Sequence, residues 1–385
     1  MKNVLLYYNF SYPLGGGDFL PLTFASWLQS RCDLTLAVDS EAGFHKALKA
    51  FDVPLDNGRI KVAPLLPDGL DSRSHNFYWS YRRSLRLKRL AAKADVCISA
   101  ANVTDFGRPA HHFINMLSGV DHAFSAHSGI VRPKTSVKRF LIDDVIRPIA
   151  GMRPKRRIFA DGRERFYSNS KYVHDRLTSF YGDFHDTIFY PPTTYEPEDS
   201  GEAPPRDPMR VICLGRISPQ KRITDIMDIV ERARTLSGKD IKLTVAGPCG
   251  NGEYATMVRQ TAKARKWITL VDGVFCKAKD DLLRSGSFAV HARRDEEFGI
   301  AVTEYLKAGL IPVVPDEGGS CEVVDKPELS YSTNEDAAAK LARLVSDCDF
   351  AGIMRSHCQS RALEFSRSEY LKRQSEILDK ILSES

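Results

Sequence analysis

The stretch SFAVHARRDEEFGIAVTEYLKAGLIPVVPDEGG, residues 287–319, decides the fold class of this sequence. It opens with an apolar run, residues 287–292, that predicts a buried strand. A charged loop follows and leads into a helical pattern that ends at Gly309. A second apolar run, residues 310–315, then ends in a glycine pair. Strand, loop, helix and strand in this order are typical of a parallel sheet covered by helices.

The same rhythm extends through both halves of the chain. Upstream in the same half, further strands are predicted at residues 210–215, 241–247 and 268–273. The first half begins with a strand at 3–10 and a glycine loop, and it continues with strand-like runs such as 94–102. A proline- and acid-rich segment between the halves has too few apolar residues to form a core element.

We therefore predict an α/β protein with two Rossmann-like, doubly wound domains that face a central cleft. The expected boundaries are an N-terminal domain over 1–195, a linker over 196–208 and a C-terminal domain over 209–365. The last segment, 366–385, is predicted to be a helix that packs back onto the first domain. In such sheets ligands bind beyond the carboxyl ends of the strands, so the loops after the strands are the expected site.

Composition excludes several other classes. The 385 residues contain no apolar run near the roughly 20 needed to cross a bilayer, and the N-terminus does not resemble a signal peptide, so a cytoplasmic location is expected. The eight cysteines include no C-x-x-C pair, which argues against a zinc site or disulfide framework. No G-x-G-x-x-G follows the first strand, as a nicotinamide dehydrogenase would require. The single D-x-D, at 347–349, lies in a polar helical region and not after a strand.

Positive charge is concentrated in the first half. Residues 82–165 carry 18 basic against 7 acidic side chains, with clusters at 82–93 and 152–157. Such clusters favour a polyanionic partner, and an anionic membrane surface is the one expected here. Nucleic acid is not expected, because no RNA-recognition, KH or zinc motif accompanies the charge. A solvated helix face is the alternative interpretation.

The loop after the strand at 210–215 carries two cations. Gly215 ends the strand, and Arg216 and Lys221 follow on either side of a turn. A guanidinium fork and an ammonium at the carboxyl end of one strand can converge on a diphosphate. By itself the pair is weak evidence for a diphosphate site, because surface Arg/Lys pairs are common.

The loop after the strand at 287–292 adds carboxylates and a helix start. Glu296 and Glu304 are separated by seven residues, and Gly299 lies where the loop turns into the helix. The unpaired N–H groups of that first turn, around Phe298 and Ile300, would favour phosphate oxygens. Glu304 could accept hydrogen bonds from ribose hydroxyls. Together with the preceding strand, this combination favours a ligand site over solvated helix residues.

Two further loops complete the predicted site. The glycine pair at 318–319 permits a close backbone approach, and nearby Glu322 could be structural or binding. The segment 271–275, which contains Val274, is a candidate wall for a nucleobase.

These residues resemble a known family. GRISPQK (215–221), EEFGIAVTEYLKAGLIPVVPDEGG (296–319) and the spacing between them are similar to glycosyltransferase family 4, retaining transferases of GT-B fold. The resemblance is specific over about 210–325 and is supported by GGG (15–17), YSNSKYV (167–173) and YPP (190–192). Residues 297–313 are especially similar to α-1,2-mannosyltransferases that extend lipid-linked oligosaccharides.

The resemblance implies a role for each matching position. Arg216 and Lys221 would hold the donor diphosphate, Glu296 would contact the donor sugar, and Glu304 would bind ribose. For the first domain it implies a histidine, for which His127 is favoured, although Asn115 or His112 occupies a comparable setting. The implied catalytic set is Arg216, Lys221, Glu296 and His127, and the implied donor-binding set is Gly16, Gly17, Gly215, Val274, Phe298, Gly299, Ile300 and Glu304. The family implies no bound metal and no cofactor beyond the sugar nucleotide.

The resulting expectation is a retaining hexosyltransferase, with mannose favoured and GDP-mannose as the first donor to consider. Its first domain would bind a glycan or lipid-linked glycan acceptor, and its second domain the nucleotide sugar. Two alternatives remain open at this point. One is a catalytically silent protein that binds nucleotide sugars, and the other is a transferase that uses a UDP-sugar and a small-molecule acceptor.

Overall fold

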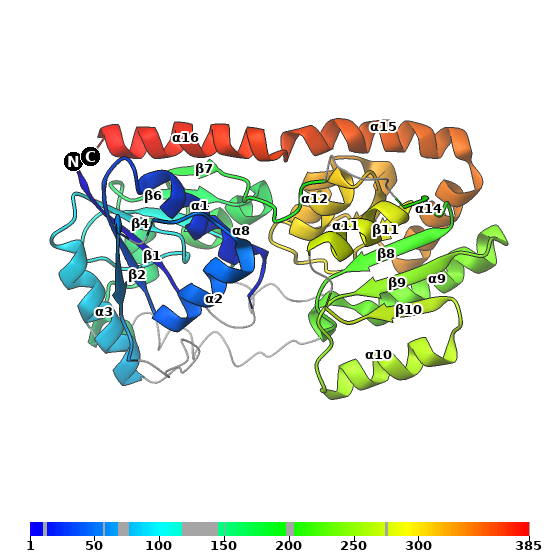
Figure 1. Ribbon diagram of the computed structural model, residues 1–385, viewed down its shortest axis with the longest axis horizontal. Coiled ribbons are helices and arrows are strands. Elements are labelled where there is room, and N and C mark those ends of the chain that lie inside the picture. Colours follow the sequence, from blue (N-terminus) through cyan, green and yellow to red (C-terminus); the bar gives the residue numbers. More distant parts are fainter. Residues whose placement is uncertain are drawn as a thin grey trace. The chain divides into compact units, whose positions relative to one another are not determined.

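A computed structural model describes residues 1–10, 14–56, 58–67, 77–117, 145–149, 151–197, 204–273 and 276–384. The chain divides into two compact units (Figure 1). The first unit comprises Met1–Thr194 and Tyr370–Ser385, and the second comprises Tyr195–Glu369. Each unit is built around one parallel sheet, so the prediction of two doubly wound α/β domains is confirmed.

The first unit contains a seven-stranded sheet with strand order β3-β2-β1-β4-β5-β6-β7. Its strands are β1 (Asn3–Tyr8), β2 (Asp33–Val38), β3 (Ile60–Pro64), β4 (Val96–Ser99), β5 (His111–Ile114), β6 (Arg165–Ser168) and β7 (Asp186–Ile188). The helices between them are η1 (Gly16–Asp18), α1 (Phe19–Leu28), α2 (Glu41–Phe51), α3 (Phe77–Ala91), α6 (Arg147–Ile149), α7 (Lys155–Phe159) and α8 (Lys171–Tyr181).

The last helix, α16 (Arg367–Glu384), contributes to the core of the first unit. Its buried residues Tyr370, Leu378 and Ile381 join the apolar side chains of β1, β2 and α1. Two polar contacts fix its position, because the Tyr370 hydroxyl lies 2.6 Å from Thr23 Oγ1 and Gln374 Nε2 donates to the Thr23 carbonyl. Helix α16, at the end of the chain, therefore forms part of the first unit.

The second unit contains a six-stranded sheet with order β10-β9-β8-β11-β12-β13. Its strands are β8 (Arg210–Leu214), β9 (Lys242–Ala246), β10 (Ile268–Val271), β11 (Phe288–Val290), β12 (Ile311–Pro315) and β13 (Ser330–Tyr331). Its helices are η3 (Pro219–Lys221), α9 (Ile223–Ser237), α10 (Glu253–Ala264), α11 (Cys276–Ser285), α12 (Ile300–Lys307), α13 (Gly319–Val324), η4 (Pro327–Leu329), α14 (Asn334–Ser346) and α15 (Cys348–Glu364).

Sequence pattern explains where the helices of the second unit lie. Along α9, the apolar residues at three- and four-residue spacing are all buried, and this face packs against α14. Thr333 caps the N-terminus of α14, because its side chain accepts a hydrogen bond from the Asp336 N–H at 3.1 Å. Gly238 ends α9 in the left-handed conformation that glycine adopts at little cost.

The strand order creates a switch point between β8 and β11. From β8 the sheet grows in one direction through β9 and β10, and in the other through β11, β12 and β13. Strands β8 and β11 pair in parallel, with Val211 opposite Phe288, so both end at the same edge of the sheet. In doubly wound sheets the loops after two such strands diverge and leave a crevice for a ligand. Here those loops are residues 215–222 and 291–299.

Within the described residues, no helix has both the length and the apolar character that crossing a bilayer requires.

Candidate functional site

The two loops at the switch point of the second unit meet through an ion pair. Lys221 ends the short helix η3 after β8, and Glu296 lies in the loop after β11. Lys221 Nζ is 2.5 Å from Glu296 Oε2, and both side chains are mostly buried. The structure thus brings together two of the predicted site residues, which are 75 residues apart in sequence but follow strands that are neighbours in space.

Glu296 is surrounded by further nitrogen atoms. His291 Nε2 lies 3.3 Å from Glu296 Oε2, and Arg293 Nη1 lies 3.7 Å from its Oε1. Burial alone raises the pKa of Glu296, but Lys221, His291 and Arg293 outweigh it and hold that pKa well below its usual range. Burial lowers the pKa of His291. The site therefore holds an ionised carboxylate at neutral pH, next to a neutral imidazole.

Arg293 organises the acidic loop that carries Glu296. Its guanidinium also pairs with Asp295 at 3.2 Å and with Glu297 at 2.9 Å. One planar fork thus contacts three successive carboxylates and fixes the loop in one conformation. The sequence reasoning did not select His291 or Arg293. The signal for Arg293 was a basic residue placed three and four positions before two glutamates, a spacing that suits ion pairing in a compact turn.

Two glycines shape the same loop. Gly299 precedes α12 with φ of 100°, and Gly318 precedes α13 with φ of 90°. A Cβ on Gly318 would lie 2.5 Å from the Arg294 carbonyl oxygen and 2.9 Å from that of Glu296. The neighbouring Gly319 N–H donates to the Glu296 carbonyl at 2.7 Å. The glycine pair after β12 therefore lies directly against the backbone of the Glu296 loop and donates one hydrogen bond to it.

Arg216, unlike Lys221, has no side-chain partner among the residues that the structure describes. Its side chain is exposed, and within the described ranges of the chain it makes no hydrogen bond or ion pair. It follows Gly215, whose φ of 149° turns the chain sharply at the end of β8. The loop after β8 thus presents one guanidinium with its full donor capacity available.

Glu304 lies on α12 and is buried. Its Oε1 accepts a hydrogen bond of 2.6 Å from Lys279 Nζ of α11. The next residue, Tyr305, donates its hydroxyl toward the Leu214 carbonyl and accepts from the Leu214 N–H at 2.5 Å, so α12 is attached to the end of β8. Phe298 is buried, and Ile300 begins the helix, where the Val302 N–H already donates to the Gly299 carbonyl at 2.8 Å.

Comparison with known proteins bears on this half of the chain. Residues 196–364 match the family model described as glycosyl transferases group 1. These residues are therefore similar to group 1 glycosyl transferases. The match contains every contact described above, from Lys221 and Glu296 to Lys279 and Glu304. We refer to residues 196–364 below as the group 1 domain.

Two curated relatives carry the name GDP-Man:Man(3)GlcNAc(2)-PP-Dol alpha-1,2-mannosyltransferase. The Yarrowia lipolytica protein is 48% identical over 56 residues, which cover 14% of this chain and 9% of that protein. The Caenorhabditis elegans protein is 24% identical over 166 residues, covering 39% of this chain and 35% of that protein. This chain therefore spans about a tenth and about a third of the length of the relatives it matches.

A solved structure shares the whole fold. The crystal structure of Anabaena Alr3699/HepE in complex with UDP and glucose superposes with a TM-score of 0.68 and 14% identity. The alignment covers 100% of both chains. At this identity the similarity establishes the two-unit architecture.

The predicted residues of the first unit have separate surroundings. Gly16 and Gly17 form the short helix η1 after β1, and a side chain on Gly17 would meet no atom within 4 Å. Asp18 pins this turn, because its carboxylate accepts from the Tyr8 hydroxyl at 3.0 Å and from the Gly15 N–H at 2.6 Å. His127 and Val274, which the sequence also selects, lie outside the described residues.

The two alternatives to His127 have structural partners. Asn115 follows β5, where its Nδ2 donates to the Ala100 carbonyl and its N–H donates to Asn102 Oδ1. His112 is fully buried, with Nε2 3.0 Å from Glu164 Oε2. These contacts account for both residues without a ligand.

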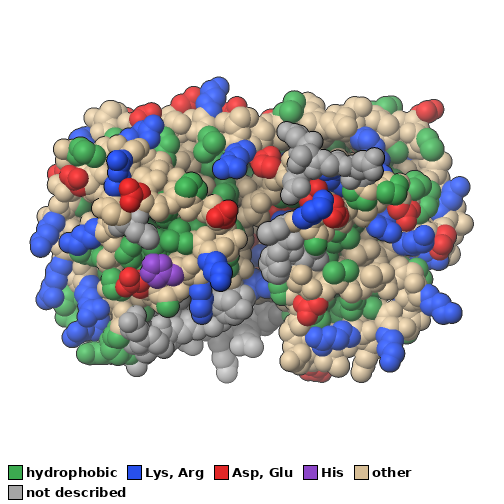
Figure 2. Space-filling view, viewed as in Figure 1, with side chains coloured by type: hydrophobic (Ala, Val, Ile, Leu, Met, Phe, Trp, Pro, Cys, Tyr) green, Lys and Arg blue, Asp and Glu red, His purple; other side chains and the backbone are tan. Residues whose placement is uncertain are grey.

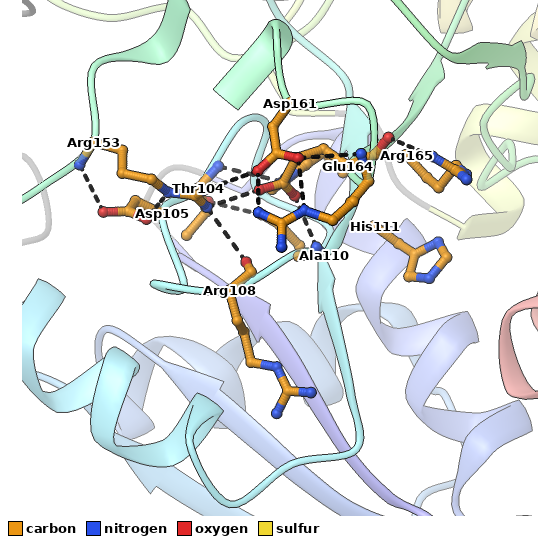
Figure 3. Close-up of polar contacts among 12 residues, drawn as sticks. Thr104, Asp105, Arg108, Ala110, His111, Arg153, Asp161, Glu164 and Arg165 are labelled. Atoms are coloured by element: carbon orange, nitrogen blue, oxygen red, sulfur yellow. Dashed lines mark hydrogen bonds and ion pairs between the residues drawn. The ribbon is translucent and has the colours of Figure 1, made fainter. Parts of the chain in front are cut away.

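Figure 3 shows Arg153, which belongs to the basic segment 152–157, among the carboxylates of Asp105, Asp161 and Glu164. Arg153 pairs with Asp105 at 2.8 Å and with Glu164 at 2.7 Å, and Lys88 of α3 pairs with the same Asp105 at 2.7 Å. Arg83 of α3 likewise pairs with buried Asp39 at 2.9 Å. Several cations of the two basic clusters thus stabilise the unit itself, and only the remainder faces solvent.

Proposed function

We propose that this chain is a retaining, metal-independent glycosyltransferase that transfers a hexose, with mannose favoured, from a nucleoside diphosphate sugar to a glycan or lipid-linked glycan. The observation that carries the proposal is the Lys221–Glu296 contact beside uncommitted Arg216, at the switch point of a group 1 domain. Mannose rests on the names of the relatives, which specify GDP-Man as donor. A UDP-sugar is the second donor to test.

Arg216 and Lys221 are proposed to bind the diphosphate. As the bond from the anomeric carbon to the phosphate oxygen breaks, negative charge grows on the leaving nucleoside diphosphate. The Arg216 fork can take two phosphate oxygens. Lys221 has three N–H donors, so it can keep its contact with Glu296 Oε2 and still donate to a phosphate. The proton of the acceptor hydroxyl would leave with the released phosphate oxygen, since retention by front-face attack needs no separate base.

The carboxylates are proposed to bind hydroxyl groups. Glu296 is ionised and held in place by Lys221 and Arg293, so it is suited to accept from the hydroxyls of the donor sugar. Glu304 would accept from ribose. The N–H groups at Phe298, Gly299 and Ile300 would meet sugar and phosphate oxygens at the start of α12.

The test is the release of free nucleoside diphosphate from a panel of nucleotide sugars, with and without acceptor, by wild-type protein and two variants. Arg216→Ala is expected to lower kcat/KM by about 10²–10³-fold, the cost of losing one electrostatic donor at developing charge. Glu304→Gln, which keeps the shape of the side chain, is expected to raise KM about tenfold or more. The exposed pair Arg232–Asp228 on α9 offers Arg232→Ala as a matched control with wild-type turnover. Unchanged kinetics in both site variants would refute the assignment.

We further propose that the first unit contacts an anionic membrane surface through 82–93 and 152–157, with Arg82, Arg89, Lys93, Arg156 and Arg157 exposed. Lys and Arg side chains gather along the edge formed by α3 in the space-filling view (Figure 2). Phosphatidylcholine vesicles that contain phosphatidylglycerol should retain the protein at low salt and release it at high salt. Arg89→Glu/Lys93→Glu should weaken retention, whereas Lys372→Glu/Lys380→Glu on α16 should not. Equal retention by pure phosphatidylcholine would contradict the proposal.

A further inference from the structure

Lys279 occupies an unusual position for a lysine. It lies in the first turn of α11, yet its side chain is only 16% exposed, because it crosses to α12 and ends 2.6 Å from Glu304 Oε1. The Glu304 side chain itself is 4% exposed. The acid next to it in sequence, Asp280, is already engaged by the Tyr195 hydroxyl at 2.8 Å and by Arg284 at 3.3 Å. Lys279 is thus directed specifically to Glu304.

The Nζ of Lys279 also lies against an aromatic ring. It is 5.8 Å from the centre of the Tyr195 ring, and Tyr195 is itself buried. A cation–π contact and a carboxylate therefore hold the ammonium from two sides. A lysine so constrained has lost most of its rotamer freedom, and the position of its charge is fixed.

We propose that Lys279 is a specificity-determining residue that sets how the nucleotide's ribose is recognised. The inference rests on the proposed contact between Glu304 and ribose. Lys279 offsets the charge of a deeply buried carboxylate and fixes its orientation through the 2.6 Å contact with Oε1. A carboxylate held in one orientation is a strong acceptor for the hydroxyls of a ribose, whereas a rotated one is not.

Lys279 has a second consequence for the donor. A nucleoside diphosphate is strongly anionic, and an uncompensated Glu304 on the helix that follows the phosphate-binding loop would repel it. The Lys279 charge cancels that of Glu304, so the site can offer a hydroxyl acceptor without opposing the phosphates. Sugar recognition at Glu296 has a separate cation, Lys221, and does not depend on Lys279.

The experiment measures the affinities of UDP, GDP and their 2′-deoxy forms for full-length protein by calorimetry. Wild-type protein is expected to prefer the ribonucleotides about tenfold or more, the value of one hydrogen bond to a charged acceptor. In Lys279→Met the preference is expected to fall to within about threefold, with KM for the donor raised and kcat little changed. Lys279→Arg, which keeps the charge, should retain most of the preference.

The same helix supplies a matched control. Lys277 is two residues away, 68% exposed and, within the described part of the chain, paired with Asp281 of its own helix, so Lys277→Met should prefer ribonucleotides as wild type does. If Lys279→Met keeps the wild-type preference, the proposal is wrong and Lys279 is structural. If Lys279→Met does not fold, the double variant Lys279→Met/Glu304→Gln removes both charges, and a wild-type preference in it would also refute the proposal.

Failure of the proposed function would look different. In that case neither ribonucleotide nor deoxyribonucleotide would bind wild-type protein, or Arg216→Ala would bind both as tightly as wild type. Loss of ribose preference in Lys279→Met, with diphosphate binding still dependent on Arg216, supports both proposals together.

Discussion

At the scale of single residues, the candidate site and the core of the first unit each contain a buried carboxylate that contacts more than one cation. Glu296 is contacted by Lys221 and Arg293 in the group 1 domain, and Asp105 by Lys88 and Arg153 in the first unit. The difference lies in what surrounds them. Arg216, exposed and without a partner in the described part of the chain, lies in the same loop as Lys221 of the first cluster. The Asp105 cluster is closed by protein groups, including the backbone N–H of Arg153.

The Asp105 cluster predicts a pH dependence of stability. Burial raises the pKa of Asp105, but hydrogen bonds from Lys88 and Arg153 outweigh this and lower it to about 2. Because the folded pKa is below the unfolded value, the stabilisation is present above about pH 4 and is lost as pH falls toward 2. Asp105→Asn should lower the free energy of unfolding by about 2 kcal/mol at pH 7, and the difference should shrink across that window. Urea denaturation at several pH values measures both.

Asp175 provides the control for this prediction. It is exposed and pairs with Lys171 one helical turn away, so Asp175→Asn should change stability by less than about 0.5 kcal/mol at either pH. A loss in Asp105→Asn that stayed constant down to pH 2 would show that the cluster does not keep Asp105 ionised.

At the scale of elements, loops that follow neighbouring strands are supported by one another's backbone. The turn at Gly318 before α13 packs under the loop that carries Glu296, with no space for a side chain. Gly318→Ala should therefore displace that loop. Its left-handed φ and the 2.5 Å contact with the Arg294 carbonyl together predict a loss of at least about 2 kcal/mol in the free energy of unfolding.

Gly252 is the matched position for this change. It precedes α10 with φ of −73°, and an added Cβ would meet no atom within 4 Å. Gly252→Ala should be nearly neutral in urea denaturation, and it should bind nucleotide as wild type does. Equal stability of the two alanine variants would contradict the view that the glycine pair is required by backbone contact.

At the scale of the whole molecule, the fold class could be predicted because the spacing of apolar residues and the positions of glycines depend on local sequence. Apolar runs that end in glycine loops, as at Gly215 and at the glycine pair 318–319, identify strands and their carboxyl ends without knowledge of tertiary contacts. Pairing across the sheet is a different matter. Lys221 contacts Glu296 because β8 lies beside β11. The sequences of the two loops give no information about that strand order.

The contacts that sequence reasoning missed are those made between elements. Lys279 on α11 reads as one of several helix-surface lysines, and nothing local distinguishes it from Lys277. The packing of α11 on α12 directs Lys279 to Glu304 and leaves Lys277 in solvent. His291 and Arg293 were inside the stretch that decides the fold, but their importance comes from the carboxylate they surround. The roles assigned to Arg216, Glu296 and Glu304 remain predictions for experiment.

The most direct test is titration of GDP-mannose and UDP-glucose into wild-type protein, Arg216→Ala and the surface control Arg232→Ala by calorimetry. The account predicts that at least one of the two nucleotide sugars binds wild-type protein and Arg232→Ala with the same dissociation constant. It predicts binding to Arg216→Ala that is weaker by about tenfold or more, since a charge-assisted bidentate contact to the diphosphate is lost. Equal affinity of Arg216→Ala and wild type, or no binding of either sugar nucleotide, would contradict the central claim.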